Sequence, residues 1–359
     1  MDRRKFLMTT GGAAAVAAGP AAASQANQAA AVAPGRESQL ADATPLKLSM
    51  PWADTPHGPA DSVRRLARRV EAMMGGRYRI EIAAGSGAPD GSADLVHGPA
   101  YGFSHHHPAF HYFAGLPGAA GLGAQDLAHW LAVGGGQMLW DDLAAEHGWK
   151  PVLAGHSGEA PPLWSRTPIT RLSDLSGRGI AAAGLGADVA RALGADAQDL
   201  APHQVARALA DGTVDAAEAG GLLASLVSGV PRVAQHATGH GLNGHGIAFA
   251  LSVRLPVWER MSEADQAILS AAAAEEFQVT LAEARAHTNI ARRVLATSFG
   301  VRFAPLPAEI TEAIDRVAEA TIAHVAGQDA ASARIDQSYM AFRAALSGTD
   351  VPRRRTAIS

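Results

Sequence analysis

The glycines of the stretch GIAAAGLGADVARALG, residues 179–194, have the spacing of a ligand-binding turn. The dinucleotide fingerprint needs the pattern G-x-G-x-x-G, in which the third glycine lets a helix pack closely on the preceding strand. Gly184 and Gly186 fit, but Val189 stands at the third position, and no Lys-Ser/Thr pair follows to hold a phosphate. Nucleotide binding is therefore disfavoured. Two interpretations remain: an ordinary strand-to-helix turn, or a turn that faces a ligand cleft at the carboxyl end of a strand.

Histidine is the other residue type with chemistry to offer, because imidazole is a common metal ligand. The histidines form two groups along the chain: His97, His105, His106, His107 and His111, then His236, His240 and His245. Three adjacent histidines cannot all point at one ion from a strand, and no H-E-x-x-H pattern is present. We expect polar loops, with no metal site and no cofactor.

The sequence gives little support to an enzyme. It has no G-x-S-x-G nucleophile motif and no pair of carboxylates at a defined catalytic spacing. It contains no cysteine, which excludes disulfides and thiol catalysis. A net charge of −4 gives no indication of a nucleic-acid partner. With 359 residues, 48% of them hydrophobic, the chain can form two domains around a sizeable core.

The N-terminus has the order of parts of an export signal. The pair Arg3-Arg4 precedes a weakly apolar run of small residues over 8–18, and an A-x-A cleavage site follows at 21–23. This order is typical of a twin-arginine (Tat) signal peptide, and the run is too short and too rich in Gly and Ala for a membrane span. We predict a Tat signal at 1–23, a disordered leader at 24–44 and a periplasmic mature protein.

Hydrophobic periodicity predicts an α/β protein with mixed sheets, because strands alternate with helices. Strands are expected at residues 46–50, 78–82, 94–97, 149–154, 178–182, 214–218 and 246–253. Helices are expected at 61–74, 125–147, 187–193, 203–211 and 262–297, and residues 307–346 should be mainly helical. The long helix at 125–147 is expected in spite of the glycines at 134–136.

Several segments together carry a family resemblance. They are RRLARRVEAMMGGRYRIEI, HGPAYGFSHHHPAFHYFAGLP, WLAVGGGQMLWDDLAAEHGWKPVLAG, LSDLSGRGI, AGLGADVARALGA, ALADGTVDAAEAG and YMAFRAAL. In order and spacing the chain resembles the DctP-type solute-binding subunits of TRAP (tripartite ATP-independent periplasmic) transporters, and most of all the branch that binds 2-oxo acids.

The resemblance implies a two-lobed periplasmic solute-binding-protein fold over residues 45–346, with mixed sheets, hinge strands, long C-terminal helices and a disordered tail at 347–359. It also implies a small organic solute, TRAP-type permease subunits as partners and, in some members, a dimer built by the C-terminal helices. We expect a dimer here because the apolar positions Ile310, Ile314, Val317 and Ile322 exceed what one small lobe needs. The alternative is that this helix braces the chain's own two lobes.

Four positions depart from what the resemblance implies for the ligand cleft. The arginine that holds the ligand carboxylate is replaced by Ala181, and Arg178 lies at an odd strand offset, so that it points to the other face. A glutamine is replaced by Ala160, a tryptophan by Ala219 and an acidic cation ligand by Gly244. The interval AAGSGAPDGSADLVHG is also too short for the helix that members carry there. A wider, less polar cleft is expected.

The candidate ligand residues that remain are Tyr101, Glu218, His156 and Ser157. Each has a structural alternative: core packing for Tyr101, acceptance of backbone N–H groups for Glu218, and a simple turn for His156 and Ser157. Two hypotheses follow. The chain is a receptor whose ligand is not a simple 2-oxo acid, or it is an interaction protein that keeps the scaffold without binding a small molecule.

The export signal yields a direct prediction. Changing Arg3 and Arg4 together to Lys should leave the precursor in the cytoplasm, since the arginine pair is what the Tat machinery reads. Cell fractionation followed by immunoblotting measures this, and normal processing of the double variant would contradict it.

Overall fold

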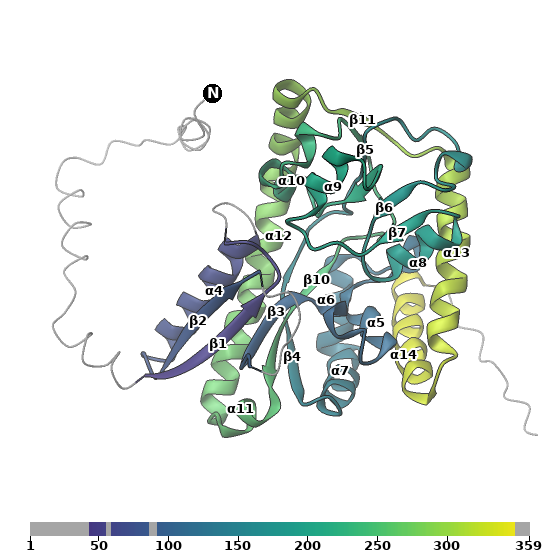
Figure 1. Cartoon of the computed structure of the whole chain (residues 1–359). Helices are drawn as coiled ribbons and strands as arrows, with labels where there is room; N and C mark the ends of the chain where they lie inside the picture. Colours follow the sequence, from purple (N-terminus) through teal and green to yellow (C-terminus); the bar gives the residue numbers. More distant parts are fainter. Residues whose placement is uncertain (1–42, 55–58, 86–91, 349–359) are drawn as a thin grey trace, which may run out of the picture. The chain divides into compact units, whose positions relative to one another are not determined.

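The computed structural model describes residues 43–54, 59–85 and 92–348 (Figure 1). The predicted signal, leader and tail lie outside these residues, except for the last residues of the leader and the first of the tail. The described residues from Pro45 onward form one compact unit. The elements are labelled as in Figure 1.

The first sheet has five strands in the order β2-β1-β3-β10-β4. The strands are β1 (Thr44–Met50), β2 (Tyr78–Ala84), β3 (Leu95–Pro99), β4 (Trp149–His156) and β10 (Ala248–Arg254). Strand β1 runs parallel to β3, and β10 lies antiparallel between β3 and β4. The sheet is therefore mixed, as predicted. The neighbouring strands β3, β10 and β4 are mostly buried, in keeping with their small and apolar residues.

The second sheet has six strands in the order β11-β9-β5-β8-β6-β7. The strands are β5 (Leu163–Ser165), β6 (Gly179–Ala181), β7 (Asp196–Gln198), β8 (Ala216–Glu218), β9 (His236–Thr238) and β11 (Arg302–Ala304). Strand β6 is parallel to both β7 and β8, so their carboxyl ends share one edge of the sheet. The three-residue strands β5, β7, β9 and β11 were not predicted, because segments this short carry no clear periodicity.

The chain crosses between the sheets three times. It leaves the first sheet after β4, returns to it with β10, and reaches the second sheet again at β11. The domain boundaries are thus not simple cuts along the sequence, which is what the order of elements predicts.

Helices cover both sheets. The α-helices are α4 (Pro59–Met73), α5 (His111–Ala114), α6 (Ala124–Val133), α7 (Gly136–Ala145), α8 (Gly184–Ala192), α9 (Val205–Asp211), α10 (Leu222–Ser228), α11 (Leu255–Arg260), α12 (Glu263–Phe299), α13 (Ala308–Ala326) and α14 (Ala330–Ser347). Short 3₁₀ turns include η1 (Ala100–Phe103), η2 (Pro108–Phe110), η3 (Gly118–Ala120) and η5 (Val230–Arg232). The two long C-terminal helices α13 and α14 confirm the predicted helical segment.

The predicted single helix over 125–147 is wrong: the chain breaks there into α6 and α7. Gly135 adopts a left-handed conformation, with φ of 85°, which ends the first helix. A side chain on Gly136 would place its first carbon 2.7 Å from the ring of Trp130. The glycine run thus permits a sharp turn over Trp130, whose indole stacks on the Phe113 ring, as the indole of Trp140 also does.

Helix α12 contributes to the cores of both sheets. Its first half buries Leu269 and Ala273 with the first sheet, and its second half buries Ala291 and Leu295 with Trp164 of the second. It contacts β4 and α4 at one end and α10 and η5 at the other. This helix therefore spans the two halves of the fold (Figure 1).

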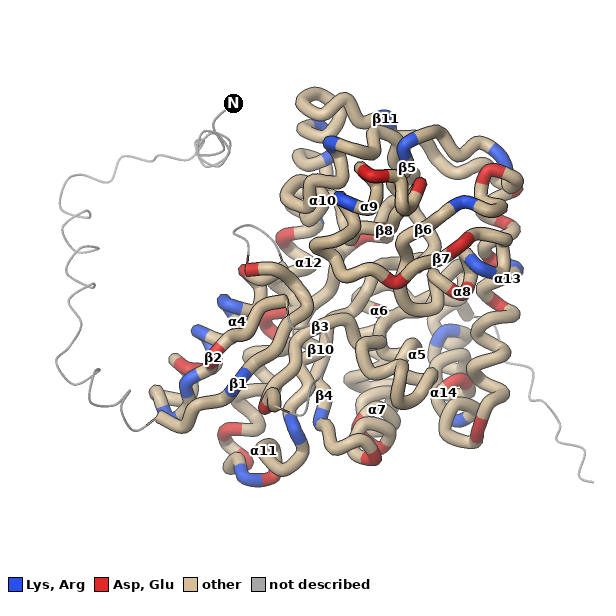
Figure 2. The backbone as a smooth tube through the Cα atoms, viewed as in Figure 1, with Lys and Arg blue, Asp and Glu red and all other residues tan. Residues whose placement is uncertain are grey.

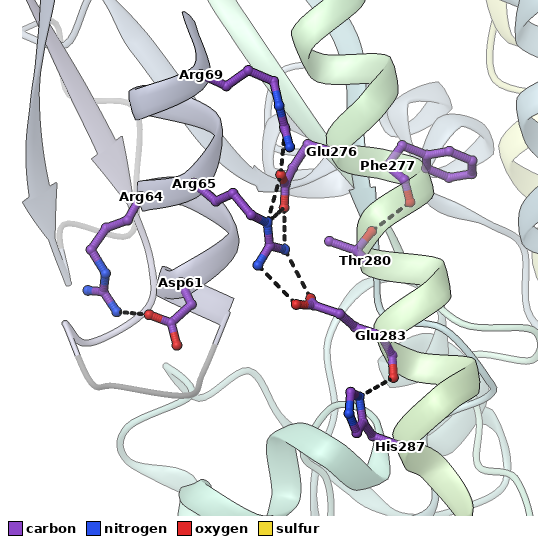
Figure 3. A network of polar contacts seen from close by, with 9 residues as sticks. All are labelled: Asp61, Arg64, Arg65, Arg69, Glu276, Phe277, Thr280, Glu283 and His287. Atoms are coloured by element: carbon purple, nitrogen blue, oxygen red, sulfur yellow. Dashed lines mark hydrogen bonds and ion pairs between the residues drawn. The ribbon is translucent and has the colours of Figure 1, made fainter. Parts of the chain in front are cut away.

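A cluster of charges fastens α4 to α12 (Figure 3). Glu276 of α12 is fully buried, and it accepts hydrogen bonds from Arg65 at 2.6 Å and from Arg69 at 2.9 Å. Arg65 also binds Glu283, two turns further along α12, at 2.9 Å. A buried carboxylate needs such partners, because an unpaired charge in the interior is strongly disfavoured.

The apolar positions of α13 do not indicate a dimer interface. Ile310 and Ile314 are buried in the core of the second sheet, and Ile322 is buried in the core around Trp130. The helix packs on α8 and on η3 of the same chain. The expectation of a dimer consequently rests on the family resemblance alone.

Charged residues lie mainly on helices and loops, with both signs interspersed (Figure 2). Within the described ranges, no helix has the length and apolar character needed to cross a membrane.

The Glu276 cluster makes a stability prediction. Replacing Glu276 by Gln should lower the free energy of unfolding by about 3 kcal/mol, because Arg69 and Arg65 lose their buried counter-charge. The matched control is Glu275→Gln on the same helix, which removes an exposed ion pair with Arg69 and should cost about 1 kcal/mol or less. Urea denaturation measures both, and equal losses would contradict the assigned role of Glu276.

Candidate functional site

The glycine turn at the start of α8 faces Tyr101 from the first half of the fold. Gly184 has φ of 60°, and a side-chain carbon there would lie 3.2 Å from the Tyr101 ring. Tyr101 lies in η1, directly after β3, and its side chain is half-buried. Its hydroxyl has no hydrogen-bond partner among the described residues. Burial is the main cause that raises the pKa of this hydroxyl, so that it stays protonated and can donate.

Asn243 ties the glycine turn to Glu218. Its side-chain oxygen accepts from Gly186 N at 3.0 Å, and its amide nitrogen donates to Ala183 O at 3.1 Å. The same amide nitrogen donates to Glu218, the last residue of β8. Sequence reasoning missed Asn243, because a single asparagine in LNGHG gives no sign of contacts with residues about 25 and 60 positions away.

Glu218 is a structural acceptor as well as a cleft residue. Its carboxylate accepts from the backbone N–H groups of Leu242 and Asn243, in addition to the Asn243 amide. Burial nevertheless raises the pKa of Glu218 to about 7, and these hydrogen bonds only partly oppose that rise. No Lys or Arg forms an ion pair with it within the described ranges. The carboxylate thus accepts backbone N–H groups, as its structural alternative predicts.

His156 and Ser157 hold the turn after β4. The Nδ1 atom of His156 accepts from Gly158 N at 3.0 Å, and the Ser157 hydroxyl accepts from Ile247 N at 2.8 Å. The simple turn role is thus present for both residues. Because Nδ1 accepts, the ring proton of His156 lies on Nε2, which has no partner among the described residues. Burial lowers the pKa of His156 to about 4, which keeps the ring neutral.

The predicted residues belong to one region of the fold. The loop after β8 brings Gly221 against the Ser157 carbonyl, 2.9 Å from where a side-chain carbon would lie. A side chain on Gly246, three residues after Asn243, would lie 2.7 Å from His156. The segment 242–247 therefore links the turn at His156 and Ser157 with Glu218 and the glycine turn.

The structure describes all four positions at which the resemblance implies ligand side chains. Ala181 is buried in the same cluster as Trp164 and Ala217, with 2% of its surface exposed. Gly244 has φ of 64°, and a side-chain carbon there would lie 3.0 Å from Leu116 O. Ala160 and Ala219 are half-buried. Arg178 binds Thr167 at 3.2 Å, and this exposed contact does not make it a substitute.

An acidic residue that sequence reasoning missed lies at the same strand ends. Asp199 is the first residue after β7, whose Gln198 is paired with Ala181 and accepts from Ala182 N at 3.1 Å. Asp199 and Glu218 both add to the rise in the Tyr101 pKa, which places the three groups within electrostatic reach of one another. The sequence gave only a weak indication of Asp199, because the strand that precedes it, β7, is only three residues long.

The histidine groups do not form a metal centre. The His106 ring stacks on the His147 ring with centroids 5.0 Å apart, and the His105 ring lies tilted beside it with centroids 4.0 Å apart. His107 lies 3.2 Å from Asp329, the residue that caps α14. No set of three or more His, Asp or Glu side chains in the described part of the chain is arranged to hold a metal ion.

A groove of about 630 Å³ lies beside this region, between α8, η2 and α13. His111, Leu185 and Asp188 line one side, and Arg316 and His324 line the other. None of the four predicted ligand residues lines it, although the His111 ring lies 6.0 Å from the Tyr101 ring.

Comparison with known proteins identifies the family. The profile of the bacterial extracellular solute-binding proteins, family 7 (DctP), matches residues 55–328. The chain belongs to this family. A monocarboxylate 2-oxoacid-binding periplasmic protein of Nostoc is 29% identical over 289 residues, which cover 77% of this chain and 78% of the relative.

Solved structures share the fold. A TRAP solute-binding protein of Bordetella bronchiseptica, a mixed-occupancy dimer with calcium and picolinate in one site, is 23% identical and superposes with a TM-score of 0.81 over 85% of this chain and 93% of its own. A TRAP protein of Pseudoalteromonas atlantica with bound sodium and pyruvate is 20% identical, with a TM-score of 0.79 over 85% and 95%. The predicted family and two-lobed α/β fold are confirmed, and both are those of transport proteins.

The buried histidines predict how stability depends on pH. Burial lowers the pKa of His97, His111 and His156 to about 4. Between pH about 6.5 and 4 these histidines are therefore protonated in the unfolded chain and neutral in the folded one. Stability contributed by these groups is present above pH about 6.5 and is lost as the pH falls toward 4, by up to about 3 kcal/mol for each histidine. Glu218, with its raised pKa, opposes this trend.

His156→Asn tests this prediction, because the Asn oxygen can replace Nδ1 as acceptor for Gly158 N. The difference in unfolding free energy between pH 7 and pH 5, measured with urea, should shrink in this variant. The exposed His203→Asn should leave the difference unchanged. A parallel pH profile for wild type and His156→Asn would contradict the prediction.

Proposed function

We propose that this chain is an exported receptor of a TRAP-type transporter, which captures a small organic solute between its two halves and presents it to membrane permease subunits. The single observation that carries the proposal is the convergence of Tyr101, Glu218 and the glycine turn within a family-7 solute-binding fold. The paired arginines at the N-terminus support export through the Tat pathway.

We infer that the solute is not a simple 2-oxo acid. The Nostoc relative is named for such acids, and the Pseudoalteromonas structure holds pyruvate. A carboxylate in a cleft needs a fixed cationic partner, usually the bidentate fork of an arginine. Here the corresponding position is Ala181, buried among apolar residues, and the described residues near Tyr101 and Glu218 include no Lys or Arg paired with them.

The Pseudoalteromonas structure holds sodium beside pyruvate, and the Bordetella structure holds calcium beside picolinate, but the described part of this chain offers no matching set of ligands. Glu218 is occupied by three donors, and Gly244 has no room for an acidic side chain. Within the described ranges, no cluster of three ligating side chains is present. We therefore assign no part of solute binding to a metal ion.

The alternative of an interaction protein without a small-molecule ligand is favoured by one surface feature. Val133 and Met138 flank the turn between α6 and α7 with 81% and 65% of their surface exposed. Phe342 of α14 packs against Gly134 at the same turn. Such a surface also suits a homodimer, which one solved neighbour forms. A thermal-shift screen against acids, sugars, amines and aromatic compounds separates receptor from scaffold, since a saturating solute raises the melting temperature.

The inferred loss of acid binding is tested by calorimetry. Pyruvate should bind the purified mature protein with a dissociation constant above about 1 mM, because its carboxylate would lose water without gaining a cationic partner. Ala181→Arg alone should not restore tight binding, since position 181 lies in the core. Micromolar binding of pyruvate by the unmodified protein would overturn the inference.

A further inference from the structure

The groove between α8, η2 and α13 is a cavity that the solute site does not use, because none of the four candidate solute residues lines it. Its volume is about 630 Å³. Small-molecule sites measure about 300–1,000 Å³, so the groove is large enough for a ligand. Helix α13 packs on η2 from the first half of the fold and on α8 from the second (Figure 1). A molecule in the groove would therefore contact both halves.

His111 offers an imidazole without a partner to this groove. It is the first residue of α5, lines the groove, and has only 8% of its surface exposed. Neither ring nitrogen forms a hydrogen bond with a described residue, and neither is sealed off from solvent. Burial lowers the pKa of His111 to about 4, so the neutral ring has one N–H donor and one acceptor nitrogen. Buried polar groups are normally hydrogen-bonded, and here a ligand can supply the bond.

Arg316 adds a positive charge to the opposite wall. Its side chain is exposed, and it forms no ion pair with a described residue. Asp188 is the acid among the lining residues, and its carboxylate is already paired with Arg191 at 2.7 Å. Glu312 and Glu319 lie on the same helix as Arg316, but neither lines the groove. Since a guanidinium fork matches a carboxylate in shape and charge, the groove favours an acid.

Apolar side chains form much of the remaining wall. They come from η2, α8 and α13 and are Pro108, Leu185, Ala192, Val317, Ala320 and Val325. Apolar surface on a ligand gains free energy when it leaves water for such a wall. A ligand with a hydrocarbon body and one carboxylate therefore fits the lining better than a small hydrophilic acid does.

We propose that this groove binds a small monocarboxylate with an apolar body, such as benzoate, as a second ligand site apart from the solute cleft. Arg316 binds the carboxylate, the His111 N–H donates to one of its oxygens, and the apolar walls cover the hydrocarbon. Leu185 directly follows Gly184 of the glycine turn, and the His111 ring lies 6.0 Å from the Tyr101 ring. The bound acid thus contacts residues adjacent to the solute cleft without entering it.

The first test compares benzoate with three probes that each lack one of its features. Benzyl alcohol lacks the charge, benzylamine reverses it, and acetate lacks the apolar body. In calorimetry on the purified mature protein, benzoate should bind about tenfold or more tightly than each of them. A smaller difference from any one probe, or no binding of benzoate at about 10 mM, would overturn the proposal.

The second test assigns the two polar groups. Arg316→Gln and His111→Phe should each weaken benzoate binding about tenfold, because each removes a hydrogen bond to a charged group. Arg316 is exposed, so its replacement tests the site even where His111→Phe disturbs folding. The matched control is Arg334→Gln, which removes an exposed arginine of α14 that does not line the groove.

The control should bind benzoate as the wild type does. An unchanged affinity in Arg316→Gln, or in a His111→Phe variant that keeps the wild-type melting temperature, would overturn the assignment. So would equal losses in Arg316→Gln and Arg334→Gln, since these would show a general effect of charge.

The third test locates the ligand. Crystals of the mature protein with a bromine-substituted benzoate should show the anomalous bromine signal in the groove, with the carboxylate on Arg316. A signal between Tyr101 and Glu218 instead would overturn the second site.

Failure of this site and failure of the receptor function have different signatures. A thermal shift caused by benzoate should disappear in Arg316→Gln, and a benzoate shift that survives this substitution overturns the groove site. The shift caused by a solute of the cleft should survive Arg316→Gln. If no compound in the screen stabilises the Arg316→Gln variant, the receptor function fails, and the groove site is still decided by benzoate binding to the wild type.

Discussion

The buried carboxylate of Glu276 sets the position of the helix that both halves of the fold share. Arg65 and Arg69 neutralise it from α4, and Arg65 reaches on to Glu283, so three turns of α12 are held against the first sheet. The same helix places Thr280, which donates to Phe277 O and accepts from His156 N at 3.0 Å. The turn that carries His156 and Ser157 is thereby fixed to α12, and the C-terminal half of α12 supports the second core.

The segment 242–247 has a comparable role on the cleft side. The Asn243 side chain forms hydrogen bonds with Gly186 N and with Glu218. Ile247 N donates to the Ser157 hydroxyl, and Gly246 lies close to the same turn after β4. Glycines at 244 and 246 permit this close approach, because both have positive φ and a side-chain carbon on either would lie within about 3 Å of neighbouring backbone oxygens. A path this crowded leaves no room for the acidic side chain that the family pattern carries at position 244.

The chemistry of the cleft follows from these constraints. A carboxylate that serves three protein donors stays buried, and burial holds its pKa near neutrality unless a cation arrives. Ala181, the position where the resemblance implies an arginine, is buried among apolar residues and adds no positive charge beside this carboxylate.

The sequence by itself determined the family, the mixed α/β fold and the long C-terminal helices, because these depend on local periodicity and on motifs in order. Its candidate ligand residues, Tyr101 and Glu218 among them, stay predictions. It failed at residues 125–147, where stacking of Trp130 on Phe113 and the left-handed Gly135 outweigh helical periodicity. Only the tertiary structure decided that Asn243 joins Glu218 to the glycine turn and that Asp199 lies within reach of Tyr101. These relations depend on strand register and on contacts between segments far apart in the chain, and no local pattern in one sequence encodes which distant residues will meet.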